Sequence, residues 1–236
     1  MTTRTRSPRG EGASLREDIV DAATQLLAET GDESSVSVRA IAARVGVSTP
    51  SLYLHFADRQ AILDAVCERV WSSLDEAMEK AAAATSTAMD DLRCRGVAYV
   101  KFGLANPEHY RIVMMDRRTD ERLPEGMVGA ASGSGLAVAT SAFAHLLESV
   151  QACIDDGTFG PGPDGPPDLI RLGLQLWAGA HGIASLVIAK PHFPWPPLDQ
   201  LVEDMIAAVG IGLAAQQRLG GYDPTELGSR LDRLRD

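Results

Sequence analysis

Residues 37–56 read SVRAIAARVGVSTPSLYLHF, and they decide the fold of the N-terminal part of the chain. Apolar residues at three- and four-residue spacing predict a helix over Val38–Val45, with Ser37 as its N-cap. Gly46 stands where the end of a helix favours a positive φ, and Val47 is the apolar contact that commonly follows. We therefore expect this helix to end in a tight turn.

A second helix is predicted directly after the turn, because Ser48 is a good N-cap and Pro50 falls in the first turn, where a missing N–H costs little. Leu52 and Phe56 share one face at i and i+4 and point inward. The side chains left outside are Thr49, Pro50, Ser51, Tyr53 and His55. This pattern is typical of a helix-turn-helix, whose second helix enters the major groove of DNA. The alternative is a helical hairpin in a larger core, with those side chains merely solvated.

The same stretch resembles the DNA-binding domain of the TetR family of bacterial regulators over about residues 14–65. The shared motif is Ile41-Ala42, Gly46-Val47-Ser48, Leu52-Tyr53, His55-Phe56, Arg59 and Leu63. The family usually has Lys where Arg59 stands, a change that keeps the charge but alters the contact geometry. The resemblance implies that the DNA backbone is held by Tyr53, His55 and Arg59. It implies that the bases face Arg39, Thr49, Pro50 and Ser51, and Ser48 belongs to the same predicted interface.

Composition favours a helical protein. The chain has 236 residues, of which 45% are hydrophobic, and no run shows the sustained alternation of a strand. We predict an all-α fold with an N-terminal three-helix helix-turn-helix domain and, as the resemblance implies, a larger C-terminal helical domain for ligand binding and dimerisation. The expected division is a basic disordered arm at 1–13, the DNA-binding domain at 14–60, the effector domain at 61–219 and a tail at 220–236.

The net charge of −10 is compatible with DNA binding once it is divided along the chain. Residues 1–59 carry seven Arg against eight acidic residues, whereas the remainder carries fifteen basic and twenty-four acidic residues. Near the N-terminus, Arg4, Arg6, Arg9 and Arg16 oppose only Glu11. Such an arm can follow phosphates or enter a minor groove. A disordered polar tail is the alternative.

Helical periodicity and capping residues predict the remaining elements. The expected helices cover 14–30, 58–84, 87–105, 107–116, 136–156, 168–190 and 198–219. A charged connection covers 116–126, a Gly/Pro loop lies at 157–167, and a proline cluster lies at 191–197. The helix at 168–190 is apolar almost all round, so we expect a homodimer through it and the helix at 198–219.

An effector site is expected in the second region because TetR-like chains generally carry one there. Residues 177–182, WAGAHG, resemble a tryptophan-histidine-glycine signature of one branch of the family. An apolar ligand needs an apolar lining with a few polar groups. The candidate lining residues are Tyr99, Phe102, Tyr110, Met114, Phe143, Trp177 and His181. Ordinary core packing is the alternative for each. The loops at 116–135 and 157–167 are long enough to admit a ligand or close over it.

The remaining residues favour no catalytic, metal or membrane function. Cys67, Cys94 and Cys153 are far apart, the histidines show no ligand spacing, and no nucleophile elbow or phosphate loop is present. The most apolar stretches are too short to span a bilayer. The sequence thus predicts a cytoplasmic repressor without a cofactor, which binds a palindromic DNA operator as a homodimer and is released by a small-molecule effector. The alternatives are an effector-free DNA-binding regulator or a helical enzyme.

Overall fold

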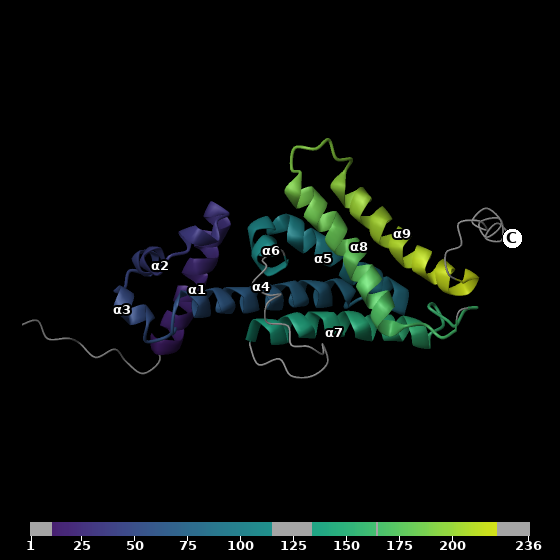
Figure 1. Cartoon of the computed structure of the whole chain (residues 1–236), viewed down its shortest axis with the longest axis horizontal. Coiled ribbons are helices and arrows are strands. Elements are labelled where there is room, and N and C mark those ends of the chain that lie inside the picture. The colour runs from purple at the N-terminus through teal and green to yellow at the C-terminus, as the bar shows by residue number, and fades with distance from the viewer. Residues whose placement is uncertain (1–10, 115–133, 164, 221–236) are drawn as a thin grey trace, which may run out of the picture. The chain divides into compact units, whose positions relative to one another are not determined.

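The computed structural model describes residues 11–114, 134–163 and 165–220 (Figure 1). In these ranges the chain is helical, and the single β-type pairing is an isolated bridge between Gly162 and Gly165. The helices are α1 Glu11–Thr30, η1 Glu33–Ser35 (a 3-10 helix), α2 Val38–Val45, α3 Thr49–Leu52, α4 Arg59–Ala82, α5 Ala88–Ala105, α6 Pro107–Met114, α7 Ser134–Asp155, α8 Leu169–Ala189 and α9 Leu198–Leu219. The predicted all-α fold is confirmed.

Aspartate side chains cap the starts of two long helices. Asp58 Oδ1 accepts the Ala61 N–H at 2.8 Å ahead of α4, and Asp168 Oδ1 accepts the Arg171 N–H at 3.0 Å ahead of α8. However, α1 begins at Glu11 rather than at the predicted Ser14, and η1 has no counterpart in the sequence-based prediction. The predicted arm up to residue 10, most of the connection at 116–135 and the tail after Gly220 lie outside the described residues.

The chain divides into two compact units. The first comprises the described parts of Met1–Ser73 and Asn106–Ala139, in which α1 packs against η1, α2 and α6. His109 of α6 places Nε2 3.2 Å from the Thr24 carbonyl of α1. The buried side chains of this first unit include Ile19, Val36, Ile41, Leu52 and Val66. The division between the units falls at Ser73, within α4, and α6 packs back on α1.

The second unit comprises Leu74–Ala105 and the described parts of Thr140–Asp236. Its helices α5, α8 and α9 pack pairwise against one another (Figure 1). A core cluster lies where α5, α7, α8 and α9 contribute apolar side chains: Leu92, Val150, Cys153, Phe159, Leu172 and Leu213. This unit therefore has a hydrophobic core of its own, as the apolar content of the chain predicts.

The Gly/Pro-rich loop between α7 and α8 is anchored to that core. Phe159 is 0% exposed, and Gly162 and Gly165 exchange backbone hydrogen bonds of 3.1 and 3.0 Å. A Cβ at Gly162 would lie 1.6 Å from the Gln217 carbonyl oxygen, so only glycine fits where the loop meets α9. The described part of this loop is thus packed on the second unit, whereas the length of the loop alone suggested that it could admit a ligand or close over one.

One helix, α8, is long and apolar enough to cross a membrane by length and composition alone. From the sequence, each apolar stretch was expected to be too short to span a bilayer, and by length α8 exceeds that expectation. Its inward face nevertheless packs on α5 and α9, where Leu172, Ala184 and Val187 are buried. The same composition suits a core helix with a second apolar face.

Candidate nucleic-acid interface and effector region

The first helix of the predicted motif, α2, has the expected caps at both ends. Ser37 Oγ accepts the Ala40 N–H at 3.1 Å, and Ile41 and Ala42 are buried. Gly46 has φ 78°, and its N–H donates to the Ala42 carbonyl at 3.0 Å. The left-handed residue ends α2 and allows the chain to turn at once into α3.

The second helix, α3, is shorter than a full recognition helix, but its inward face agrees with the prediction. Leu52 is 1% exposed and Phe56 6%, and the Phe56 N–H donates to the Leu52 carbonyl at 3.0 Å beyond the end of α3. Ser48 has the extended backbone of an N-cap, but its hydroxyl lies 2.8 Å from Ser51 Oγ and does not cap a backbone N–H.

The predicted DNA-contacting side chains mostly face outward. Ser48, Pro50 and Arg39 are exposed, whereas Thr49, Ser51 and His55 are partly buried. Tyr53 is 53% exposed. The turn at 48–55 therefore presents hydroxyl, phenol and imidazole groups, which can donate to phosphates or to base edges.

Leu54 is a surface residue that the sequence reasoning did not single out. It is 81% exposed, the largest exposed fraction among the large apolar side chains of the described chain. Its place between Tyr53 and His55, off the Leu52–Phe56 stripe, is the signal that predicts this exposure. An apolar side chain here can contact thymine methyl groups, which lie in the major groove.

Arg59 is engaged within the protein. Its Nε donates to the Val36 carbonyl at 2.8 Å, and the guanidinium also donates to the Glu33 carbonyl and pairs with the Glu33 carboxylate at 3.1 Å. These contacts tie the start of α4 to η1 and to the residue that precedes the Ser37 cap. Arg59 thus stabilises the helix-turn-helix through contacts with residues more than twenty positions earlier in the sequence.

Other arginines of the first unit also have acidic or aromatic partners. Arg44 makes two hydrogen bonds to the Glu29 carboxylate, and Arg69 pairs with Glu17 and Asp21. The Arg44 pair lowers the pKa of Glu29. Arg16, which was counted with the basic arm, lies in α1 with its guanidinium 4.9 Å from the centre of the Phe56 ring. Arg4, Arg6 and Arg9 lie outside the described residues.

Four of the seven predicted effector-site residues come together in the second unit. Trp177 Nε1 donates to Tyr99 OH at 3.2 Å, and Tyr99 OH lies 3.3 Å from His181 Nδ1. The ring of Phe143 lies 5.9 Å from that of Trp177. Burial lowers the pKa of His181 below 6.5, which favours the neutral imidazole. A neutral Nδ1 can then accept a hydrogen bond from the Tyr99 hydroxyl, so the three groups form one hydrogen-bonded chain.

The other three predicted residues lie on α5 and α6. Phe102 is half-buried on α5. Tyr110 is 1% exposed on α6, which belongs to the first unit, as does the half-buried Met114. Core packing accounts for Tyr110.

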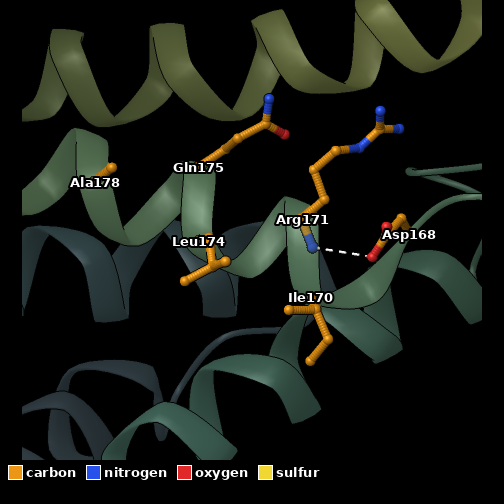
Figure 2. A pocket seen from close by; sticks show the side chains of 6 residues that line it. All are labelled: Asp168, Ile170, Arg171, Leu174, Gln175 and Ala178. Atoms are coloured by element: carbon orange, nitrogen blue, oxygen red, sulfur yellow. Dashed lines mark hydrogen bonds between the residues drawn. The ribbon is translucent and has the colours of Figure 1, made fainter. Parts of the chain in front are cut away.

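A shallow depression follows the outer face of α8 (Figure 2). It is lined by Asp168, Ile170, Arg171, Leu174, Gln175 and Ala178. None of the predicted effector-site residues lines it. Figure 2 shows Ile170 and Leu174 on one side of the helix and Arg171 and Gln175 on the other. Because a single helix supplies this lining, the feature is an exposed helix face and not an enclosed ligand site.

Within the described ranges, no group of three His, Cys, Asp or Glu side chains could hold a metal ion. Cys67 and Cys94 are partly buried, and Cys153 is buried in the core of the second unit. Burial raises the pKa of the Cys153 thiol to about 12, so this side chain stays a neutral, inert core residue at neutral pH.

A capped helix-turn-helix with an outward-facing polar turn, followed by a second helical unit, defines a class of DNA-binding proteins. Residues 19–66 match the family model for "Bacterial regulatory proteins, tetR family". Residues 92–209 match the model for "Tetracyclin repressor-like, C-terminal domain". The chain belongs to the TetR family of transcriptional regulators.

Individual relatives agree with this assignment. The class D tetracycline repressor protein of Escherichia coli is 38% identical over 55 residues, which cover 23% of this chain and 25% of the relative. A solved structure of a Rhodococcus sp. RHA1 protein with unknown function is 30% identical, with 89% of this chain and 100% of that chain covered and a TM-score of 0.70. A TetR family transcription regulator from Marinobacter aquaeolei VT8 has the same fold at 16% identity, with 86% and 98% covered and a TM-score of 0.59. The chain spans about a quarter of the length of the curated relatives it matches.

Proposed function

We propose that this chain is a cytoplasmic repressor that binds a near-palindromic operator as a homodimer and releases it when a small, mainly apolar molecule binds in the second unit. The observation that carries the DNA-binding part is the turn at 48–55, which exposes polar side chains while Leu52 and Phe56 are buried beneath it. The proposed DNA-facing residues are Arg39, Ser48, Thr49, Pro50, Ser51, Tyr53, His55 and Arg59.

The homodimer is supported by the outward faces of α8 and α9. Large apolar side chains remain exposed on both helices: Ile170, Leu174, Trp177, Leu186, Met205 and Ile211. Large apolar side chains exposed on two neighbouring helices are typical of an interaction surface. The same two-helix face on a second copy can cover it, because a two-fold interface uses one patch on both subunits. Two recognition helices would then meet half-sites about one helical turn apart, or a multiple of it.

The effector response is supported by the aromatic cluster of Tyr99, Phe143, Trp177 and His181. It combines apolar ring surface with one hydrogen-bonded polar chain, which suits an apolar ligand with a single polar group. The alternative, an effector-free regulator, is distinguished by a thermal-shift screen of apolar compounds. A ligand that binds only the folded state must raise the melting temperature, whereas an effector-free protein shows no shift with any compound.

Binding-site selection from a random pool of duplex DNA tests the DNA-binding proposal. We expect the full chain to enrich a near-palindromic sequence. Thr49→Ala should change the preferred bases, whereas Tyr53→Phe should weaken binding to all sequences alike, because phosphate contacts carry no sequence information. If no sequence were enriched at low salt, the proposal would fail.

Leu54→Ala should relax a preference for thymine at one position.

Arg59→Ala is expected to lower the free energy of unfolding by about 1 to 2 kcal/mol, because it removes charged hydrogen bonds to the Val36 and Glu33 carbonyls. Arg59→Lys should not restore them, since an ammonium group lacks the planar fork. Urea unfolding of the wild type and the two variants measures the difference in the free energy of unfolding.

The salt dependence of DNA binding tests the proposed phosphate contact separately. A slope smaller by about one unit in the Ala variant supports that contact, and an unchanged slope contradicts it.

A further inference from the structure

Charged side chains from three helices of the second unit meet around His145. The charged groups are Asp75, Glu79, Asp91, Arg95 and His145, and the neutral Ser149 joins them; these residues come from α4, α5 and α7. His145 Nδ1 lies 2.8 Å from Asp75 Oδ1, which joins α7 to α4. Arg95 donates to Glu79 at 2.7 Å and to Asp91 at 2.8 Å, which joins α5 to α4. Ser149 Oγ donates to Asp91 at 2.9 Å.

The charges in this cluster are unequal. Asp75 and Glu79 on α4 and Glu148 on α7 act on His145 directly, and Asp91 on α5 is linked to them through Arg95. Arg95 is the permanent cation among these groups, and its side chain is only 15% exposed. When His145 loses its proton, four carboxylates therefore share one cation, and the hydrogen bond from Nδ1 to Asp75 loses its charge.

We propose that the His145–Asp75 pair is a proton-dependent clamp between α7 and α4, through which alkaline pH weakens operator binding. The clamp itself is a property of the second unit. Its effect on operator binding rests on the proposed DNA-binding function, so the two parts are tested by separate measurements.

The route to the DNA-binding residues is α4 itself. This helix is uninterrupted from Arg59 to Ala82, so Arg59 and Asp75 belong to the same helix. At its first residue, Arg59 bonds to the Val36 and Glu33 carbonyls ahead of α2. A change in how firmly Asp75 is held therefore acts on the helix that begins at the contacts of Arg59 with the helix-turn-helix.

The direction of the pH effect follows from the acidic surroundings. The hydrogen bond that His145 donates to Asp75 raises the pKa of His145 above 6.5, against the opposing effect of burial, and the charges of Asp75, Glu148 and Glu79 act in the same direction as the bond. A histidine with a raised folded-state pKa stabilises the fold fully below its unfolded pKa. That contribution is lost as the pH rises through the folded-state value. The clamp is thus closed in mild acid and opens on the alkaline side of 6.5.

The test compares the full-length wild type with His145→Gln and with His192→Gln, a matched control in the exposed loop before α9. The probe is the duplex selected by the wild type, and its dissociation constant is measured at about pH 6 and about pH 9 at constant ionic strength. We expect the wild type and the control to bind about fivefold more weakly at the higher pH. His145→Gln should bind with the weaker affinity at both. Equal pH dependence in wild type and His145→Gln would overturn the proposal and assign the effect to another group, such as His55 in the recognition turn.

A second measurement keeps the clamp testable without DNA. Amide hydrogen exchange in residues 74–82 should be slower at about pH 6 than at about pH 9 in the wild type, after correction for the intrinsic rate, and independent of pH in Asp75→Asn. The NMR pKa of His145 should fall toward 6.5 in Asp75→Asn. Unchanged exchange and an unchanged pKa would refute the clamp. Failure of the wild type to bind any duplex, with the clamp intact, would refute the proposed function instead.

Discussion

Phe159→Ala is expected to lower the free energy of unfolding by about 3 to 5 kcal/mol, measured by urea denaturation followed by circular dichroism. Phe159 is 0% exposed, although it lies in a loop of glycines and prolines. It packs with Val150, Cys153 and Leu172 in the core of the second unit. Removing the ring leaves a cavity that α7 and α8 can fill only by moving closer together, so both the transfer and the cavity costs apply.

Phe193→Ala is the matched control because it deletes the same ring from the loop between α8 and α9, where Phe193 is 56% exposed. This variant should change the stability by less than about 0.5 kcal/mol. If Phe159→Ala cost as little as the control, the loop at 157–167 would be only loosely attached and could still act as a gate. The difference between the two variants therefore measures how firmly the loop is held.

The elements that sequence reasoning predicts best are those whose signals are local. α2 has its N-cap, its buried stripe and its left-handed glycine within ten consecutive residues, and all three features agree with the structure. The misses depend on contacts between distant residues. η1 is held by Arg59, which lies more than twenty residues further on, and periodicity carries no signal for a three-residue helix. The glycines and prolines around Phe159 indicate an exposed loop, whereas its side chain packs in the core of the second unit.

The candidate effector site shows the same limit. Trp177 and His181 lie one turn apart on α8, which the spacing predicts, and their rings are 6.3 Å apart. Tyr99 joins them only because α5 packs against α8, so no local pattern indicates the hydrogen bonds. The pairing of His145 with Asp75 is hidden for the same reason, since seventy residues separate them. Sequence spacing finds partners on one helix and misses partners between helices.

Ile211→Lys is expected to convert the proposed homodimer into a folded monomer. Ile211 is 66% exposed on α9, so the isolated chain gains little from burying it, and the substitution should leave the thermal midpoint of the monomer unchanged. In the proposed dimer the same side chain faces its counterpart helices, and a lysine there would bury a charge without a partner. Light scattering at micromolar concentration measures the change in mass.

The loss of the dimer should weaken operator binding by at least about a hundredfold, because a monomer engages one half-site and loses the effective concentration of the second domain. Ala152→Lys, at an exposed position of α7, adds the same positive charge away from α8 and α9 and should keep both the mass and the affinity of the wild type. This control separates the interface from the general attraction of an added cation to DNA. A dimeric Ile211→Lys protein with wild-type affinity would contradict the proposed interface. The exposed apolar side chains of α8 and α9 would then belong to a surface other than this dimer interface.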